Sequence, residues 1–179
     1  MKKIKLYTDG ACSRNPGPGG WGCVLLYTNP NGEVYRKELN DFVRDTTNQQ
    51  MELTAAVRGL QELSEPCEVT VYSDSAYFID NAQPSTGRVY NWRSNGWTLQ
   101  NGSEPKNVDL WKEFVTVAAK HKYTLVKVAA HSDDVENNRC DVLAKKGYLE
   151  YEKKKKEEAI KRLERKQNKL GIETGSDPK

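Results

Sequence analysis

Long apolar runs are missing from this chain of 179 residues. Because a membrane-spanning helix needs about 18 or more consecutive apolar residues, no transmembrane segment is expected. The first residues, 1–4, lead directly into a strand-like alternation without the apolar core of a signal peptide. We therefore expect a cytoplasmic protein with no membrane association. The 36% hydrophobic fraction is sufficient for a core, so the body is not expected to be disordered.

Cysteine and histidine are both scarce, at four and two residues. The cysteines Cys12, Cys23, Cys67 and Cys140 include no CxxC pair, which argues against a zinc site. We expect most of them to be reduced thiols in a reducing compartment.

An excess of one charge sign is also lacking, since the formal net charge is only +3. That excess lies in residues 150–179, which hold 10 Lys or Arg and 7 Asp or Glu, whereas residues 1–149 hold 18 of each. Attraction of the body to nucleic acid must therefore come from local patches or from bound metal rather than from net charge.

Periodicity predicts a single layered domain followed by a short extension. Strands are expected at residues 3–8, 21–28, 33–39, 68–72 and 123–129, and helices at 46–63, 75–81, 108–120 and 134–149. Residues 84–105 read as irregular because they contain Gly87, Gly96 and Gly102. A meander followed by alternating strands and helices indicates an α/β (α+β) fold with a mixed sheet over residues 1–149.

Residues 150–179 form a charged, basic C-terminal extension. Lys153 to Lys156 are four consecutive lysines, and Glu157 and Glu158 stand four positions before Lys161 and Arg162. The extension is either a solvated charged helix or a disordered tail. Alternatively, it makes an electrostatic contact with nucleic acid or acts as a weak partner helix.

Four carboxylates stand out by position. Asp9 and Asp74 follow predicted strands, while Glu52 and Asp141 lie on predicted helices. Any one of them alone is more often a solvated surface acid. If all four converge, their repulsion requires a counter-charge, and an all-oxygen ligand set favours Mg²⁺ or Mn²⁺ over Zn²⁺. Two such metals can activate water and stabilise a leaving oxygen at phosphorus.

The motifs around these acids, taken in order, resemble type 1 ribonuclease H of the bacterial ribonuclease HI kind. They are Thr8–Gly22, Thr46–Leu53, Tyr72–Ser75 and Glu136–Asp141. The resemblance covers residues 1–149 and implies a five-stranded mixed sheet flanked by helices. It also implies hydrolysis of the RNA strand of an RNA–DNA hybrid, with 3′-hydroxyl and 5′-phosphate products. Asp9, Glu52, Asp74 and Asp141 match the family's metal ligands, which implies two Mg²⁺ ions with substrate bound and Mn²⁺ as a possible substitute.

His131 lies ten residues before Asp141 in a polar loop. A lone histidine is more often a plain surface residue. The resemblance implies a catalytic role for His131 in proton transfer or product release, because it matches a loop histidine of the family. The preceding residues Val128 to Ala130 depart from the Lys-Gly pair that is typical there.

The resemblance also implies substrate contacts around the acids. Backbone groups from Gly10 to Cys12, with Asn48 and Gln49, are expected to read the RNA 2′-hydroxyls. Further substrate contacts are expected from Asn15, Thr47 and Asn137. Thr47 matches a residue of the DNA-phosphate pocket, where Gln50 replaces a residue that is often basic. We therefore expect looser phosphate binding there.

Residues 88–97 resemble the family's handle. Arg88 and Arg93 are expected to contact the DNA backbone, with Trp92 against a sugar. The alternative is that Trp92, like Trp97 and Trp111, packs the handle against the body. This handle has few lysines, so we expect it to bind the hybrid weakly.

Two other functions compete with hybrid cleavage. One is a catalytically silent hybrid-binding module, and the other is a related polynucleotide transferase or resolvase on the same fold. The complete set of acids argues against the first. The handle and the Asn48–Gln49 pair favour the hybrid-cutting type, which we expect to act as a monomer.

Overall fold

The computed structural model describes residues 1–129 and 133–173, with side chains described up to Lys169. The elements follow the order β1 (Lys2–Cys12), β2 (Gly17–Thr28), β3 (Val34–Thr46), α1 (Asn48–Gln61), β4 (Cys67–Ser73), α2 (Ala76–Ala82), α3 (Arg88–Ser94), α4 (Val108–Ala118), β5 (Lys122–Lys127) and α5 (Val135–Glu173). The chain divides into two compact units, Met1–Tyr148 and Leu149–Lys179. No described helix has the length and apolarity to cross a membrane.

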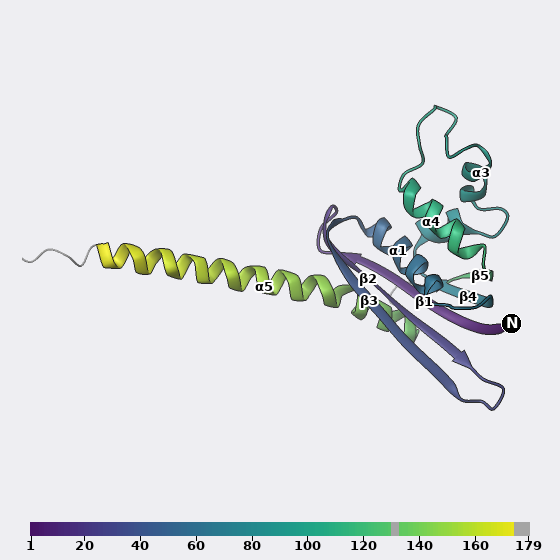
Figure 1. Ribbon diagram of the computed structural model, residues 1–179, viewed down its shortest axis with the longest axis horizontal. Helices are drawn as coiled ribbons and strands as arrows, with labels where there is room; N and C mark the ends of the chain where they lie inside the picture. Colours follow the sequence, from purple (N-terminus) through teal and green to yellow (C-terminus); the bar gives the residue numbers. More distant parts are fainter. Residues whose placement is uncertain (130–132, 174–179) are drawn as a thin grey trace, which may run out of the picture. The chain divides into compact units, whose positions relative to one another are not determined.

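The first unit is built on a five-stranded mixed sheet of order β3-β2-β1-β4-β5 (Figure 1). The strands β1, β2 and β3 form an antiparallel meander, and β4 and β5 then add in parallel beside β1. This arrangement confirms the predicted fold class.

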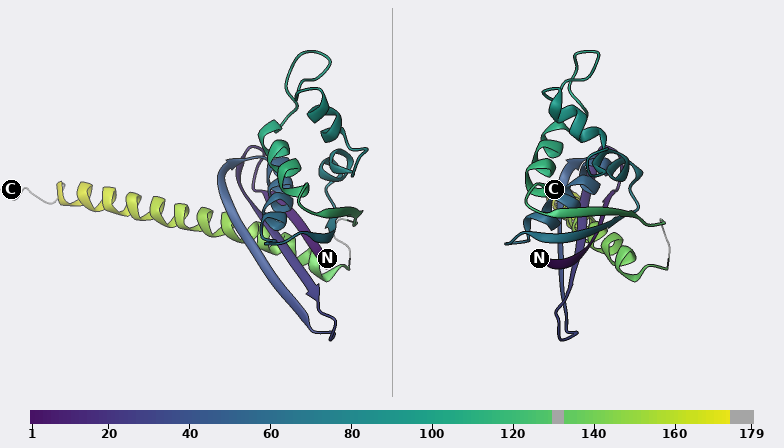
Figure 2. Two further views of the ribbon diagram at one scale, coloured as in Figure 1. Left: turned by 45° about the vertical axis from the view of Figure 1, so that its right-hand side comes forward. Right: turned by 90° about the vertical axis from the view of Figure 1, so that its right-hand side faces the viewer.

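Strand β1 alternates between two hydrophobic layers, as a period of two requires. Leu6 packs into the larger core with α1 and α4, whereas Tyr7 packs with Cys140 and Leu143 at the start of α5. Figure 2 shows the sheet between α1 and α4 on one side and this part of α5 on the other. Both faces of the central strand are therefore covered.

An aromatic cluster fills the larger core. Trp111 on α4 is fully buried, with its ring centroid 6.4 Å from that of Phe78 and 5.8 Å from that of Phe114. Its indole Nε1 donates to the Tyr77 hydroxyl at 2.9 Å, which satisfies its polar atom. Trp92 packs edge-on against Trp111 at 6.0 Å. Trp92 and Trp111 therefore pack the predicted handle against the body of the domain, which was the alternative to a contact with DNA.

The meander is longer than its sequence pattern predicts. Strand β1 does not stop at Asp9 but continues to Cys12, because Ala11 and Cys12 pair with Gly20 and Gly19 of β2. Strand β3 continues to Thr46, seven residues past the predicted end. Residues 17–20, which lie outside the predicted strands, form the start of β2, and neighbouring backbone packs where side chains would stand. A β-carbon on Gly20 would collide with the carbonyl oxygen of Ala144.

Two predicted boundaries among the helices are also wrong. Residues 84–105 are not wholly irregular, since α3 occupies Arg88–Ser94. This helix has seven residues, too few for a helical period to emerge from the pattern. Helix α5 does not end near 149 but continues to Glu173. Of the two predicted forms of the extension, helix or disordered tail, residues 150–173 therefore have the helix.

Candidate active site

The four candidate carboxylates line one cavity of about 430 Å³. Its lining is Asp9, Gly10, Ala11, Cys12, Asn48, Glu52, Asp74, Asn137, Asn138, Asp141, Lys145 and Tyr148. The acids come from β1, α1, the end of β4 and α5, so residues more than 130 positions apart in sequence meet at one place. Sequence reasoning therefore named four acids that the fold brings together.

Asp9 lies within β1, opposite Gly22 of β2. On the other side, the pairing of β1 with β4 ends at Tyr7, so Asp9 stands just beyond the parallel ladder. Asp9 is 9% exposed, and its Oδ1 accepts a hydrogen bond from the Gly10 amide at 2.8 Å. Burial, and then the charges of Asp74, Asp141 and Glu52, raise the pKa of Asp9 to about 7.

Gly10 permits β1 to touch the backbone of α1. A β-carbon at this position would lie 2.8 Å from Cα of Glu52, and closer still to the Glu52 nitrogen and the Met51 carbonyl carbon. A residue without a side chain is thus required where Asp9 and Glu52 are brought together.

Glu52 is held by two donors from different elements. Its Oε1 accepts from Asn48 Nδ2 at 2.8 Å, and its Oε2 accepts a short hydrogen bond from the Ser75 hydroxyl. Burial raises the pKa of Glu52, while the hydrogen bond from Ser75 opposes that rise. The carboxylate is therefore fixed in place while two oxygen lone pairs remain for a further partner.

Asp74 follows directly after the last residue of β4, as predicted for a strand end. The next residue, Ser75, caps helix α2 by accepting from the Phe78 amide at 3.1 Å. Ser75 thus has two contacts, one that begins α2 and one that reaches Glu52. Nothing in the sequence marks this second contact, because it joins residues 23 positions apart.

Asp141 faces the cavity from α5 and pairs with Lys145 one turn later, at 2.7 Å. The hydrogen bond to Asp141 raises the pKa of Lys145. Sequence reasoning did not include Lys145, although the spacing of four residues was a usable signal. The approach of α5 depends on Gly22, where a β-carbon would lie 2.7 Å from the carbonyl oxygen of Cys140.

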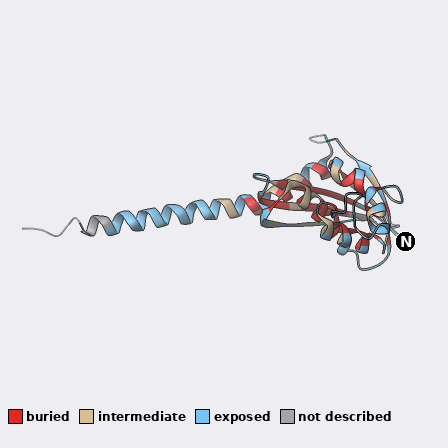
Figure 3. Ribbon diagram, turned by 90° about the horizontal axis from the view of Figure 1, so that it is seen from above, coloured by how far each residue is buried: buried red, intermediate tan, exposed pale blue. Residues whose placement is uncertain are grey.

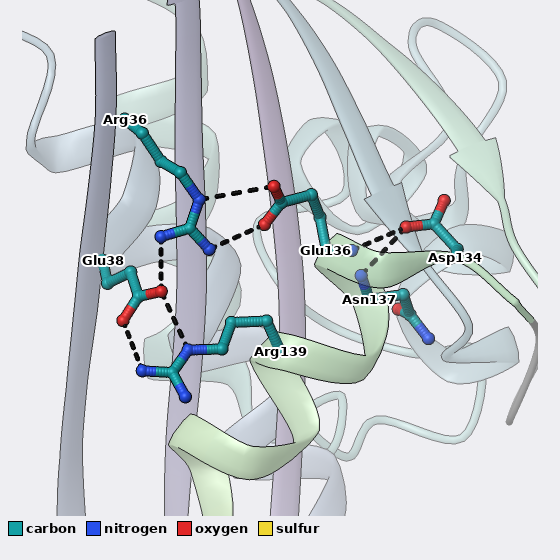
Figure 4. A network of polar contacts seen from close by, with 6 residues as sticks. All are labelled: Arg36, Glu38, Asp134, Glu136, Asn137 and Arg139. Atoms are coloured by element: carbon teal, nitrogen blue, oxygen red, sulfur yellow. Dashed lines mark hydrogen bonds and ion pairs between the residues drawn. The ribbon is translucent and has the colours of Figure 1, made fainter.

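The start of α5 is anchored at its cap and to β3. Asp134 Oδ1 accepts from the amides of Glu136 and Asn137, each at 3.0 Å. Arg36 binds Glu136 through two nitrogens, and Arg139 binds Glu38 through two more at 2.8 Å each (Figure 4). Paired contacts of this kind fix geometry as well as adding energy.

Asn137 is 2% exposed and lies between these anchors at the cavity wall. Among the described residues its Oδ1 has no hydrogen-bond partner. A buried amide oxygen without a partner is costly, so it is suited to accept from a bound group.

The donor set of the cavity fits a divalent cation. Carboxylates that raise one another's pKa are stabilised together by a positive charge, and hard oxygen ligands suit Mg²⁺ or Mn²⁺. In the described part of the chain, no three such side chains are close enough to form a ready ligand set. Glu52 and Asp141 are instead engaged by Ser75 and Lys145.

The N-terminus of α1 holds several predicted substrate residues. Asn48 lines the cavity, and its backbone N–H donates to Asn15 Oδ1 at 3.2 Å. Thr47 is the N-cap, and Gln50 completes a capping box by accepting from the Thr47 amide at 3.1 Å. Gln50 therefore has a structural role that sequence reasoning missed, although the Thr-x-x-Gln spacing predicts it. The Oε1 of Gln49 is buried without a partner among the described residues.

The structure does not bring every predicted residue to the cavity. Gly10, Cys12, Asn48 and Asn137 line it, whereas Arg88, Trp92 and Arg93 lie on α3 and are absent from its lining. Arg88 and Arg93 are exposed. His131 lies outside the described residues.

A family model and the curated relatives of this chain agree on one family, ribonuclease H. The family model described as RNase H matches residues 1–149. A ribonuclease H from Acetivibrio thermocellus is 49% identical over 144 residues, covering 80% of this chain and 93% of that protein. A ribonuclease H from Moorella thermoacetica is 49% identical over 145 residues, covering 81% and 91%.

Solved structures agree with the fold. LC9-RNase H1, described as a type 1 RNase H with the type 2 active-site motif, superposes with a TM-score of 0.73 at 25% identity. The match covers 83% of this chain and 72% of that one. LC11-RNase H1, solved in complex with an RNA/DNA hybrid, shares the fold at a TM-score of 0.57 and 22% identity, over 83% and 98% of the two chains.

Proposed function

This chain belongs to the ribonuclease H family of endonucleases, which hydrolyse the RNA strand of RNA–DNA hybrids, and we propose that its catalytic centre is the four-carboxylate cavity. One observation carries the proposal: Asp9, Glu52, Asp74 and Asp141 line a single cavity although they come from four elements. The family is divalent-metal dependent, and these four acids are the residues that would hold the metal.

The chemistry begins with binding of the scissile phosphate at the cavity. A divalent cation, when bound, supplies positive charge that lowers the pKa of water and stabilises charge on phosphate oxygens. The hydrogen bonds from Asn48 and Ser75 orient Glu52, and the backbone contact at Gly10 holds Asp9 beside it. Such preorganisation aligns an attacking water with the phosphorus–oxygen bond to be broken.

The wall of the cavity supports recognition of RNA. The Asn48 side chain and the backbone from Gly10 to Cys12 offer donors and acceptors to a 2′-hydroxyl, which is itself both. Asn137 contributes an amide oxygen without a partner among the described residues. Gln49 and Asn15 stand at the same helix end and extend this polar surface. His131 is proposed to assist proton transfer or product release.

Thr47, Arg88 and Arg93 are proposed to bind the DNA strand, whereas Trp92 packs against Trp111. For Thr47 the capping hydroxyl already accepts from the Gln50 amide at 3.3 Å, so a phosphate would be bound through the hydroxyl proton. Arg88 and Arg93 are exposed on α3 and available to a phosphate backbone.

The direct test is cleavage of a labelled RNA–DNA hybrid. With Mg²⁺ present we expect internal cuts in the RNA strand and none in double-stranded DNA. Asp9→Asn should abolish turnover and preserve the fold, whereas Asp80→Asn, an exposed aspartate on α2, should leave activity unchanged. Binding of the hybrid without cleavage by the wild-type chain would support the silent binding module instead.

Three finer features complete the proposal. Mg²⁺ is the expected metal, with two ions when substrate is bound and Mn²⁺ as a substitute, because every candidate ligand is a carboxylate. The chain is expected to work as a monomer in the cytoplasm. Activity in matched Mg²⁺ and Mn²⁺ titrations and sedimentation of the active protein test the metal and the oligomeric state.

A further inference from the structure

The second compact unit carries a dense positive charge on a single helix. Within α5, residues 153–169 are all exposed (Figure 3). They include nine basic and three acidic side chains. The first unit, by contrast, has no net formal charge, since residues 1–149 hold equal numbers of basic and acidic side chains. Any strong electrostatic attraction to a polyanion is therefore concentrated here.

The charges of this helix are unevenly distributed around its axis. At about 100° per residue, seven of the nine basic side chains fall within about 140° of the circumference. We call these the basic face: Lys154, Lys155, Lys161, Arg162, Arg165, Lys166 and Lys169. One acid, Glu158, lies among them. Lys153 and Lys156 project outside this face.

The rest of the helix surface is different in character. Ile160 and Leu163 form a narrow apolar stripe and are 55% and 60% exposed. Lys156 and Gln167 interrupt the stripe. Two exposed aliphatic side chains are too few for insertion into a bilayer or for a coiled-coil seam, each of which needs a sustained apolar repeat. The basic face, with Glu158 as its one acid, is thus the most extended feature of this helix.

We propose that the basic face binds the phosphate backbone of the hybrid on which the first unit acts. The inference rests on the proposed function for the identity of the nucleic acid. Charge complementarity carries it: residues 153–169 span about 25 Å as a helix, and a duplex presents a negative charge about every 1.7 Å along its axis. The contact reads no sequence, and it adds affinity where the handle has few lysines.

The run of four lysines offers a matched test in the full chain. Lys154→Gln/Lys155→Gln removes two charges from the basic face, whereas Lys153→Gln/Lys156→Gln removes two from outside it. Both variants have the same composition and net charge, and Gln has nearly the helix propensity of Lys. Binding to a long RNA–DNA hybrid is measured over a series of salt concentrations in the Asp9→Asn background, which avoids cleavage.

The face variant should lower the slope of log K against log salt by about two, since each lost phosphate contact lowers it by about one. With affinity at 1 M salt unchanged, its affinity near 0.1 M salt should fall by about two orders of magnitude, and the control should change much less. In the otherwise wild-type chain, kcat at saturating hybrid should stay unchanged while KM rises. Circular dichroism checks that both variants keep their helix.

Equal losses in the two variants would overturn the assignment to a face, and unchanged slopes in both would overturn the contact altogether. Face-dependent binding to phosphatidylserine vesicles but not to hybrid would make a membrane the partner. The proposed function fails separately, when the wild-type chain binds hybrid with this face dependence yet cuts none.

Discussion

Replacing Gly10 with alanine should disable the site more than it destabilises the protein. The added β-carbon would lie 2.8 Å from Cα of Glu52, whereas ordinary contact begins at 3.4 Å. The Glu52 nitrogen and the Met51 carbonyl carbon lie closer still, so β1 and α1 must separate by clearly more than about 0.6 Å, because backbone atoms on both sides have no rotamer to change. The movement falls directly between Asp9 and Glu52.

Two magnitudes separate the effects of Gly10→Ala. Overpacking of this kind costs about 1–3 kcal/mol of stability, which a folded domain can tolerate. A misplacement of about 1 Å between catalytic groups costs about 100-fold in rate. We therefore expect kcat on a labelled hybrid to fall roughly 10- to 100-fold, while thermal unfolding still shows one cooperative transition.

Gly59→Ala is the matched control. There the added β-carbon would meet the end of the Leu6 side chain, 2.5 Å away, on the core side of α1. A flexible side chain can rotate, so stability changes while the carboxylates stay in place. Full activity in Gly10→Ala, or an equal loss in both variants, would refute the reasoning from backbone contact.

Three further perturbations test other parts of the first unit. Gln50→Ala should lower stability by about 1 kcal/mol in thermal unfolding, through loss of the capping box, and Gln50→Glu should restore it. Glu38→Gln should lower the melting temperature at neutral pH. Hydrogen bonds from Arg139 and Arg36 lower the pKa of Glu38 to about 2. The stabilisation is therefore full above the ordinary pKa of 4.5 and is lost as the pH falls toward 2, where variant and wild type should converge. Lys145→Met should lower the metal concentration for half-maximal activity, because it frees Asp141.

Each of these outcomes has a clear opposite. A Gln50→Ala protein as stable as the wild type would remove the capping role. A stability gap for Glu38→Gln that persists unchanged at pH 2 would show that charge is not its cause. A higher metal requirement in Lys145→Met would mean that the ammonium group organises the site rather than competing for Asp141.

The acids were predictable because their neighbours are diagnostic as an ordered set, whereas their supports were not. Asp74 follows a strand end, which sequence pattern detects, whereas Asp9 lies within β1. The hydrogen bond from Ser75 to Glu52 depends on how β4 and α1 pack, and no local spacing encodes it. The capping role of Gln50, by contrast, is encoded locally in the Thr-x-x-Gln spacing.

The extent of the meander could not be predicted for a related reason. Glycine in a strand usually signals a turn, yet Gly20 and Gly22 lie in β2 because α5 packs on their backbone. Their lack of side chains follows from a helix more than 100 positions later, which a local pattern cannot include. The helix α3 could not be predicted for a different reason, since seven residues are too few to show a helical period.

Asp141 lies on the last element of the first unit, and this placement has a consequence during synthesis of the chain. The meander, α1, β4 and Asp74 all lie within the first 74 residues of the chain, so three of the four acids can assemble early. The fourth arrives only when α5 is made, packs on Gly22 and pairs with Arg36 through Glu136. A nascent chain on the ribosome, surrounded by RNA, therefore holds an incomplete centre until nearly the whole unit has been translated.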